Sequence, residues 1–159
     1  MKFHYLLILL MSLTIISCGD DGGDEPTDDL LTGKVRGVDF TYGSGRFIDY
    51  GDDFDEFVIR IDNAGPMVTD SCTTNSDDAY ITLDVKKETG RKDLFYDNST
   101  GEGITVVFSH PDIFQNLIIE GGGWYDIKSF TEEELVIEFD IDQGEDNNVK
   151  GSCTLYKCN

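Results

Sequence analysis

The chain has 159 residues and carries 32 Asp and Glu against 12 Lys and Arg, so its formal net charge is −20 at pH 7. Such a charge argues against nucleic acids and anionic lipid headgroups as partners, because like charges repel. It suits a cationic partner or divalent cations, and it equally suits a domain that only has to stay soluble on a crowded surface.

The N-terminal residues are typical of a secretory signal peptide. Lys2 gives a positive start, and an apolar run over residues 6–16 follows it. A run of about 11 residues is too short for a membrane-spanning helix, which needs about 20. Residues 15–18, Ile-Ile-Ser-Cys, look like the lipobox of a bacterial lipoprotein, with lipidation at Cys18. The remaining alternative is a plain secreted protein in which Cys18 is an unmodified thiol.

The segment after Cys18 is rich in glycine and acidic residues. It cannot bury apolar surface and its charges repel one another, so we expect an extended, disordered tether. The chain is thus predicted to divide into a signal peptide (residues 1–17), the lipidated Cys18 with its acidic tether (residues 18–30) and one β domain (residues 31–159). Several acyl chains on Cys18 would hold the protein stably in a membrane, where a single chain binds only marginally.

The rest of the chain alternates apolar and polar residues with a period of two, which is typical of half-buried strands. The clearest case is residues 135–142, which place four large apolar side chains on one face and three acids on the other. Other strands are predicted at residues 33–42, 46–50, 57–61, 81–85, 94–96, 103–109, 117–120, 124–128 and 149–156, with turns at residues 43–45, 63–66, 89–90, 121–123 and 144–148. About 8–10 short strands without a long helical pattern predict an all-β fold, either an antiparallel β-sandwich or a small closed barrel.

Three cysteines, Cys72, Cys153 and Cys158, follow the one at Cys18. Cys153 and Cys158 would lie about 16 Å apart in an extended strand, whereas a disulfide needs Cα atoms within about 7 Å. The alternation of the strand points Cys153 into the core, and Cys158 lies beyond the strand. We therefore predict a disulfide between Cys72 and Cys158, with Cys153 as a buried thiol.

Few residues are candidates for catalysis. His110 is the only histidine after the signal peptide, and its neighbours Ser109 and Asp112 are too close in sequence to form a catalytic triad with it. The sequence therefore predicts no enzyme activity and no resident cofactor. Trp124 follows three glycines; we expect it in the core, and an exposed platform for stacking sugars is the alternative.

Two acidic clusters are candidates for binding calcium. The first comprises Asp52, Asp53 and Asp55, directly followed by Glu56, and the second comprises Asp142, Glu145 and Asp146. The second does not fit an EF-hand loop, because Glu145 stands where glycine is required. Adjacent strands could bring the two loops together into one oxygen-rich calcium site, and two separate solvated loops are the alternative.

Residues 32–40, Thr-Gly-Lys-Val-Arg-Gly-Val-Asp-Phe, follow the lipobox and the acidic tether. With residues 57–61, residues 148–152 and the positions of Cys72 and Cys158, they make the chain resemble small surface lipoproteins of the Bacteroidota type. The resemblance implies a place on the outer membrane and export to the cell surface, with the acidic run after the lipidated cysteine as the associated signal. Cys153 departs from the two-cysteine pattern of this group, and the resemblance implies no particular activity.

These features predict a lipid-anchored binding or interaction module at the cell surface, with a cationic protein or a glycan as its partner. Long polar loops on a rigid β scaffold favour binding over turnover. A calycin-like β-barrel that carries a small apolar ligand is the alternative; a hydrolase and a structural envelope component are further classes. The filling of the interior distinguishes the binding module from the carrier: large residues such as Phe57, Phe108 and Phe139 would close a sandwich core, whereas a barrel with small inward residues would leave a cavity.

Overall fold

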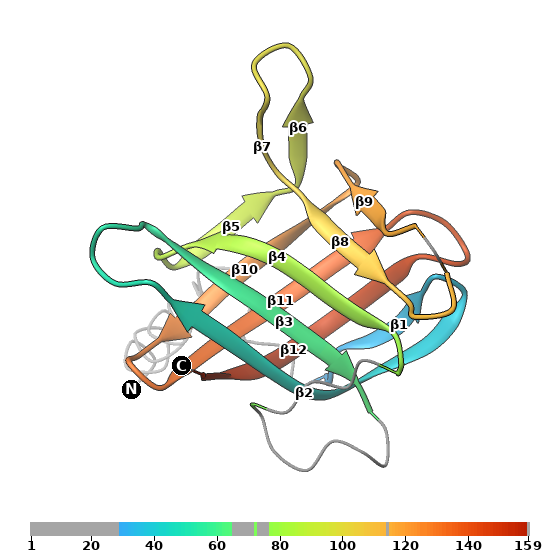
Figure 1. Ribbon diagram of the computed structural model, residues 1–159, viewed down its shortest axis with the longest axis horizontal. Coiled ribbons are helices and arrows are strands. Elements are labelled where there is room, and N and C mark those ends of the chain that lie inside the picture. Colours follow the sequence, from blue (N-terminus) through green and yellow to red (C-terminus); the bar gives the residue numbers. More distant parts are fainter. Residues whose placement is uncertain (1–28, 65–71, 73–76, 114, 159) are drawn as a thin grey trace, which may run out of the picture.

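The computed structural model describes residues 29–64, 72, 77–113 and 115–158 (Figure 1). This part of the chain forms strands and no helix, as the alternation predicts. No helix that could cross a membrane is therefore found in these described ranges. The strands are β1 (Thr32–Val35), β2 (Val38–Asp49), β3 (Glu56–Asn63), β4 (Tyr80–Lys86), β5 (Gly90–Asp93), β6 (Phe95–Asp97), β7 (Glu102–Ile104), β8 (Val106–Ser109), β9 (Leu117–Ile119), β10 (Gly123–Phe130), β11 (Glu134–Asp142) and β12 (Asn148–Lys157).

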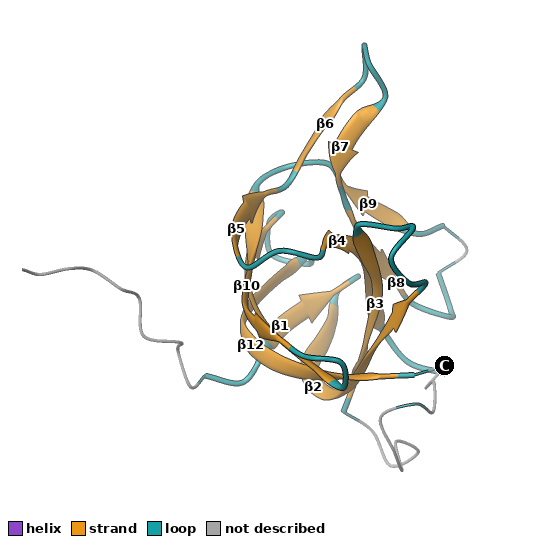
Figure 2. Ribbon diagram, turned by 90° about the vertical axis from the view of Figure 1, so that its left-hand side faces the viewer, coloured by secondary structure: helices purple, strands orange, loops and turns teal. Residues whose placement is uncertain are grey.

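Ten of these strands form one continuous sheet in the order β5-β10-β11-β12-β1-β2-β3-β4-β8-β9. Neighbours in this order are antiparallel, and β12 also pairs with β2 in parallel at Tyr156 and Lys157. The sheet is curled into a half-barrel (Figure 2), and its end strands β5 and β9 do not pair with one another in the described part of the chain. The predicted all-β, antiparallel fold is confirmed.

The N-terminal part of the sheet differs from the predicted strand pattern at two places. A turn at Arg36 and Gly37 divides the strand expected at residues 33–42 into β1 and β2. Both turn residues have positive φ, 58° and 81°, as a two-residue type I′ hairpin requires. The turn predicted at residues 43–45 is instead a bulge inside β2, where the pairing with β3 shifts its register.

Large side chains fill the inner face of the half-barrel. Phe57, Phe108 and Phe139 are at most 3 % exposed, so large residues close the core. Tyr125 is fully buried, and its hydroxyl oxygen accepts a hydrogen bond from Lys86 N at 3.4 Å. This contact joins β10 to β4 across the interior. Burying each such apolar side chain contributes about 1.5–3 kcal/mol to folding.

Asp49, the last residue of β2, holds several chain segments together at one end of the half-barrel. Its carboxylate forms ion pairs with Lys87 Nζ and with Lys157 Nζ, the second at 3.5 Å. The hydrogen bond from Lys87 is the main cause that lowers the pKa of Asp49 from 3.8 to about 2. Because the pKa is lower in the folded state, ionised Asp49 stabilises the fold above about pH 4, and the contribution is lost as the pH falls towards 2.

We therefore expect Asp49→Asn to lower the melting temperature at pH 7 and to have little effect near pH 2. Thermal unfolding followed by circular dichroism across this pH range measures the difference. Asp112→Asn is the matched control, because Asp112 is exposed and forms no ion pair among the described residues. An Asp49→Asn effect of equal size at both pH values would contradict the role given to these ion pairs.

Candidate functional site

The large sheet forks between β4 and β8. The two strands pair from Tyr80 with Ser109 to Leu83 with Val106, and no further. Beyond Leu83, β4 continues to Lys86 with β3 as its neighbour. The chain before Val106 leaves the sheet and forms β7, which pairs with β6. The resulting β6–β7 arm stands out from the half-barrel (Figures 1 and 2).

A cleft of about 510 Å³ lies in this fork, between β4 and the β6–β7 arm, and is called the fork cleft below. Its lining residues are Glu56, Asp84, Lys86, Phe95, Gly101, Glu102, Gly103, Ile104 and Thr105. One wall thus comes from the outer face of β3 and β4, and the other comes from the arm. Its volume falls in the range of sites that bind small molecules and side chains.

Carboxylates outnumber cations in the fork cleft. Lys86 Nζ lies 2.7 Å from Glu56 Oε1 and 3.3 Å from Asp55 Oδ2 at the rim. Asp84 and Glu102 have no ion pair in the described part of the chain. Desolvation raises the pKa of Asp84, and the charge of Glu56 raises it further. A cation that enters the cleft would relieve this repulsion between neighbouring carboxylates.

The β6–β7 arm adds exposed aromatic surface to the acidic cleft. Phe95 lines the cleft and is 50 % exposed, and the neighbouring Tyr96 is 38 % exposed. Aromatic ring faces attract cations. The two strands of the arm approach so closely that a Cβ on Gly103 would lie 2.2 Å from Phe95 O. Glycine at position 103 is therefore required for the arm to form.

The first predicted acidic cluster lies in the β2–β3 loop, beside the fork cleft. Asp52, Asp53 and Asp55 precede Glu56, and Asp55 pairs with Lys86. Among the residues that the structure describes, no three His, Cys, Asp or Glu side chains are arranged to hold a metal ion. The geometry therefore gives no support to the calcium hypothesis for Asp52, Asp53 and Asp55, and we do not carry it further.

The second acidic cluster lies at the opposite end of β2 from the first (Figure 1). It belongs to the β11–β12 loop, where Asp146 O accepts a hydrogen bond from Gly37 N at 2.8 Å, next to the first residue of β2. The β2–β3 loop follows the last residue of this strand. The 12 residues of β2 span about 3.3 Å each. The hypothesis that the two clusters form one site is therefore wrong.

The β11–β12 loop borders a second cleft, of about 590 Å³. Two of its three acids have local partners: Asp142 Oδ1 accepts a hydrogen bond from Gly144 N at 2.9 Å, and Asp140 Oδ2 lies 2.8 Å from Lys150 Nζ. None of the described residues that line this cleft is aromatic. The fork cleft is therefore the stronger candidate for a binding site.

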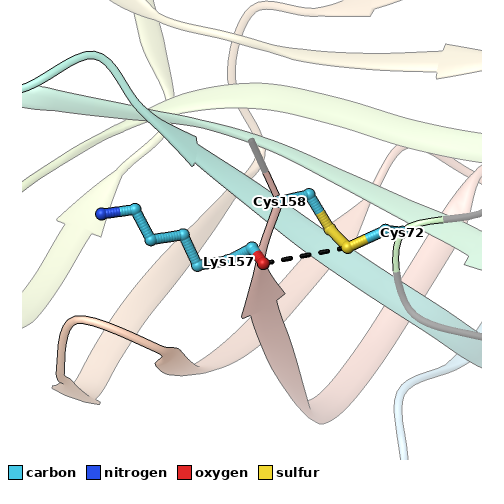
Figure 3. The surroundings of a disulfide bond; sticks show 3 residues. All are labelled: Cys72, Lys157 and Cys158. Carbon is cyan, nitrogen blue, oxygen red and sulfur yellow. Dashed lines mark hydrogen bonds between the residues drawn. A yellow bond between two sulfur atoms is a disulfide. The ribbon is translucent and has the colours of Figure 1, made fainter.

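Cys72 and Cys158 form a disulfide, with Cα atoms 5.6 Å apart (Figure 3). Cys158 follows β12, and its backbone N–H donates to Phe47 O at 3.0 Å. Cys72 belongs to the connection between β3 and β4. The disulfide therefore holds this residue next to β2. Cys153 is unpaired and buried, and burial raises the pKa of its thiol. The structure thus agrees with the predicted pairing and with the predicted buried thiol.

His110 and Trp124 do not line the fork cleft. His110 Nδ1 accepts a hydrogen bond from Asp112 N at 3.2 Å, within its own loop. Trp124 is only partly buried, and the guanidinium carbon of Arg91 lies 4.2 Å from its ring centroid. The expectation of a core tryptophan is wrong, because the alternation of β10 gives the inward position to Tyr125 instead.

Comparison with protein-family models, curated protein sequences and solved structures finds no match to this chain. The fork cleft is therefore proposed as a site from its geometry alone. Glu56 belongs to the acidic run that the sequence marks, but Asp84, Phe95 and Glu102 come from three further strands and share no sequence pattern. The sequence predicts one strand at residues 103–109. It therefore does not show that the chain leaves the large sheet before Val106.

Proposed function

We propose that the chain is a lipid-anchored, cell-surface binding module that captures a cationic partner in the fork cleft. The observation that carries this proposal is an open cleft that combines three carboxylates with the exposed ring of Phe95. Carboxylates bind a lysine or arginine side chain through charge-assisted hydrogen bonds, and an aromatic face adds a cation–π contact. The net charge of −20 would also steer such a partner towards the protein.

The anchor belongs to residues outside the described part of the chain, and its support is the sequence. The signal peptide, Cys18 in a lipobox and the acidic tether are the features that favour it. Lipidation at Cys18 would attach the domain to the outer membrane, and an extended tether would place the fork cleft away from the bilayer. A surface position suits a module that captures a partner from outside the cell.

Binding without turnover is the function class that the fork cleft supports best. His110 follows Ser109, at the end of β8 that is farther from the fork, and the hydrogen bond of its imidazole in the described structure stays within its own loop. A carrier of an apolar ligand would need an empty interior, whereas Tyr125, Phe108 and other large side chains fill it here. We therefore do not propose the carrier function.

The test is a titration with an oligolysine peptide, followed by calorimetry at low ionic strength. We expect the triple variant Glu56→Gln, Asp84→Asn and Glu102→Gln to bind at least about tenfold more weakly than wild type. Each carboxylate close to a bound cation contributes about 0.5–1 kcal/mol, and about 1.4 kcal/mol corresponds to tenfold in affinity. Added salt should weaken the wild-type interaction, because it screens these charges.

A matched control separates the fork cleft from the overall charge. Asp112→Asn, Glu132→Gln and Glu133→Gln neutralise the same number of acids at exposed positions that do not line the cleft. This control is expected to bind within about twofold of wild type. An equal loss in both triple variants would contradict a site in the fork, and a wild-type protein that binds no oligolysine would contradict a cationic partner.

A further inference from the structure

The β6–β7 arm has unpaired strand edges in the described structure. It is a two-stranded sheet with no third strand, and such a hairpin is only marginally stable alone in water. Residues 102–105 of the arm line the fork cleft. Across the cleft, residues 84–86 of β4 pair with β3 but not with β8. Two strand segments, each with a neighbour on one side only, therefore border the same cleft.

Each edge already has one backbone donor in use. On the β4 side, Lys86 N–H donates to Tyr125 Oη at 3.4 Å, and on the arm side Glu102 N–H donates to Thr100 Oγ1 at 3.3 Å. Ile104, two residues further along β7, turns its N–H to the same edge as Glu102 and makes no backbone hydrogen bond outside the arm in the described contacts. Free N–H and C=O groups along a strand edge are a template for one more strand. The edge of β7 is the better template, because a third strand stabilises a two-stranded arm more than a strand that already belongs to the ten-stranded sheet.

We propose that the partner enters the fork as an extended segment that adds to the free edge of β7 as a third strand. This inference rests on the proposed function, since it uses the same cleft and the same cationic chemistry. Side chains of an extended segment alternate between two sides, so every second one would point towards Glu56 and Asp84. The partner is therefore an extended segment with lysine or arginine at alternate positions.

Charge also decides between this partner and a second copy of the chain. The arm carries Asp97 and Glu102, opposite one another in the β6–β7 pairing. Pairing two arms would bring four carboxylates together, and like charges on adjacent strands destabilise a sheet. A cationic segment places opposite charges at the same positions, so it fits this edge where a second copy does not.

The test compares three peptides that share one sequence of alternating lysine and valine. One peptide has ordinary amides, and the other two are N-methylated at every second residue, in the two possible registers. Methylation removes the backbone donors on one edge of the extended peptide and leaves its charge unchanged. We expect one methylated peptide to bind at least about tenfold more weakly to the wild-type protein and the other to bind like the unmodified peptide.

Amide hydrogen exchange gives a second measurement on the same complex. The amides of Glu102 and Ile104, which face the edge away from β6, should exchange at least about tenfold more slowly when the unmodified peptide is bound. If all three peptides bind equally and exchange is unchanged, strand addition is overturned, while capture of a cationic partner still stands. If none of the peptides binds, the proposed function is overturned together with this inference.

Discussion

Changing Cys72 and Cys158 to serine together is expected to lower the free energy of unfolding by about 4–5 kcal/mol. The two cysteines are 86 residues apart in sequence, so their bond closes a long loop and restricts the unfolded chain strongly. Domains of this kind are stable by about 5–15 kcal/mol in total, so the loss is a large fraction. Denaturant unfolding of the oxidised wild type and the double variant measures the difference.

Cys153→Ala is the matched control for the disulfide. It removes a buried sulfur and leaves the Cys72–Cys158 bond in place, so we expect a loss of only about 1 kcal/mol from the small cavity. Peptide mapping of the unreduced protein checks the pairing directly. A peptide that joins Cys72 to Cys153 would contradict both the predicted pairing and the buried thiol.

Cys18→Ser is expected to abolish attachment to the membrane. Several acyl chains on one cysteine give stable anchoring, and without the thiol no diacylglyceryl group can be added. Radiolabelled palmitate should therefore enter the wild-type protein and not the Cys18→Ser variant. Label in both proteins, or in neither, would contradict the lipoprotein hypothesis.

Protease added to intact cells should remove the domain if the tether carries it to the cell surface, and full protection would place it inside the outer membrane.

Strands with one buried face were predictable from the sequence. The alternation at residues 135–142 matches β11, because every second side chain there must be apolar to face the core. Glycines were less informative, since they mark both turns and bulges. Only the pairing with β3 shows that residues 43–45 are part of a bulged strand. The turn at Arg36 depends on Asn147 Oδ1, which accepts its N–H from 111 residues away.

The candidate site was only partly predictable, for a related physical reason. The disulfide followed from strand parity, which decides on which side of β12 a cysteine lies. The fork could not be predicted in this way. The apolar and polar residues of positions 103–109 alternate in the same way whether the segment pairs with β4 along its whole length or leaves β4 at Thr105. Where two strands separate is decided by tertiary packing. Only the acidic run that ends at Glu56 indicated this part of the surface.

Amide chemical-shift mapping shows directly whether a cationic partner binds in the fork cleft. Isotope-labelled wild-type protein is titrated with oligolysine, and the shift of each backbone amide is followed. We expect saturable shifts that are largest at residues 84–86 and 95–105, on the two walls of the cleft. Shifts centred on the β11–β12 loop, or small shifts spread over every acidic residue without saturation, would contradict it.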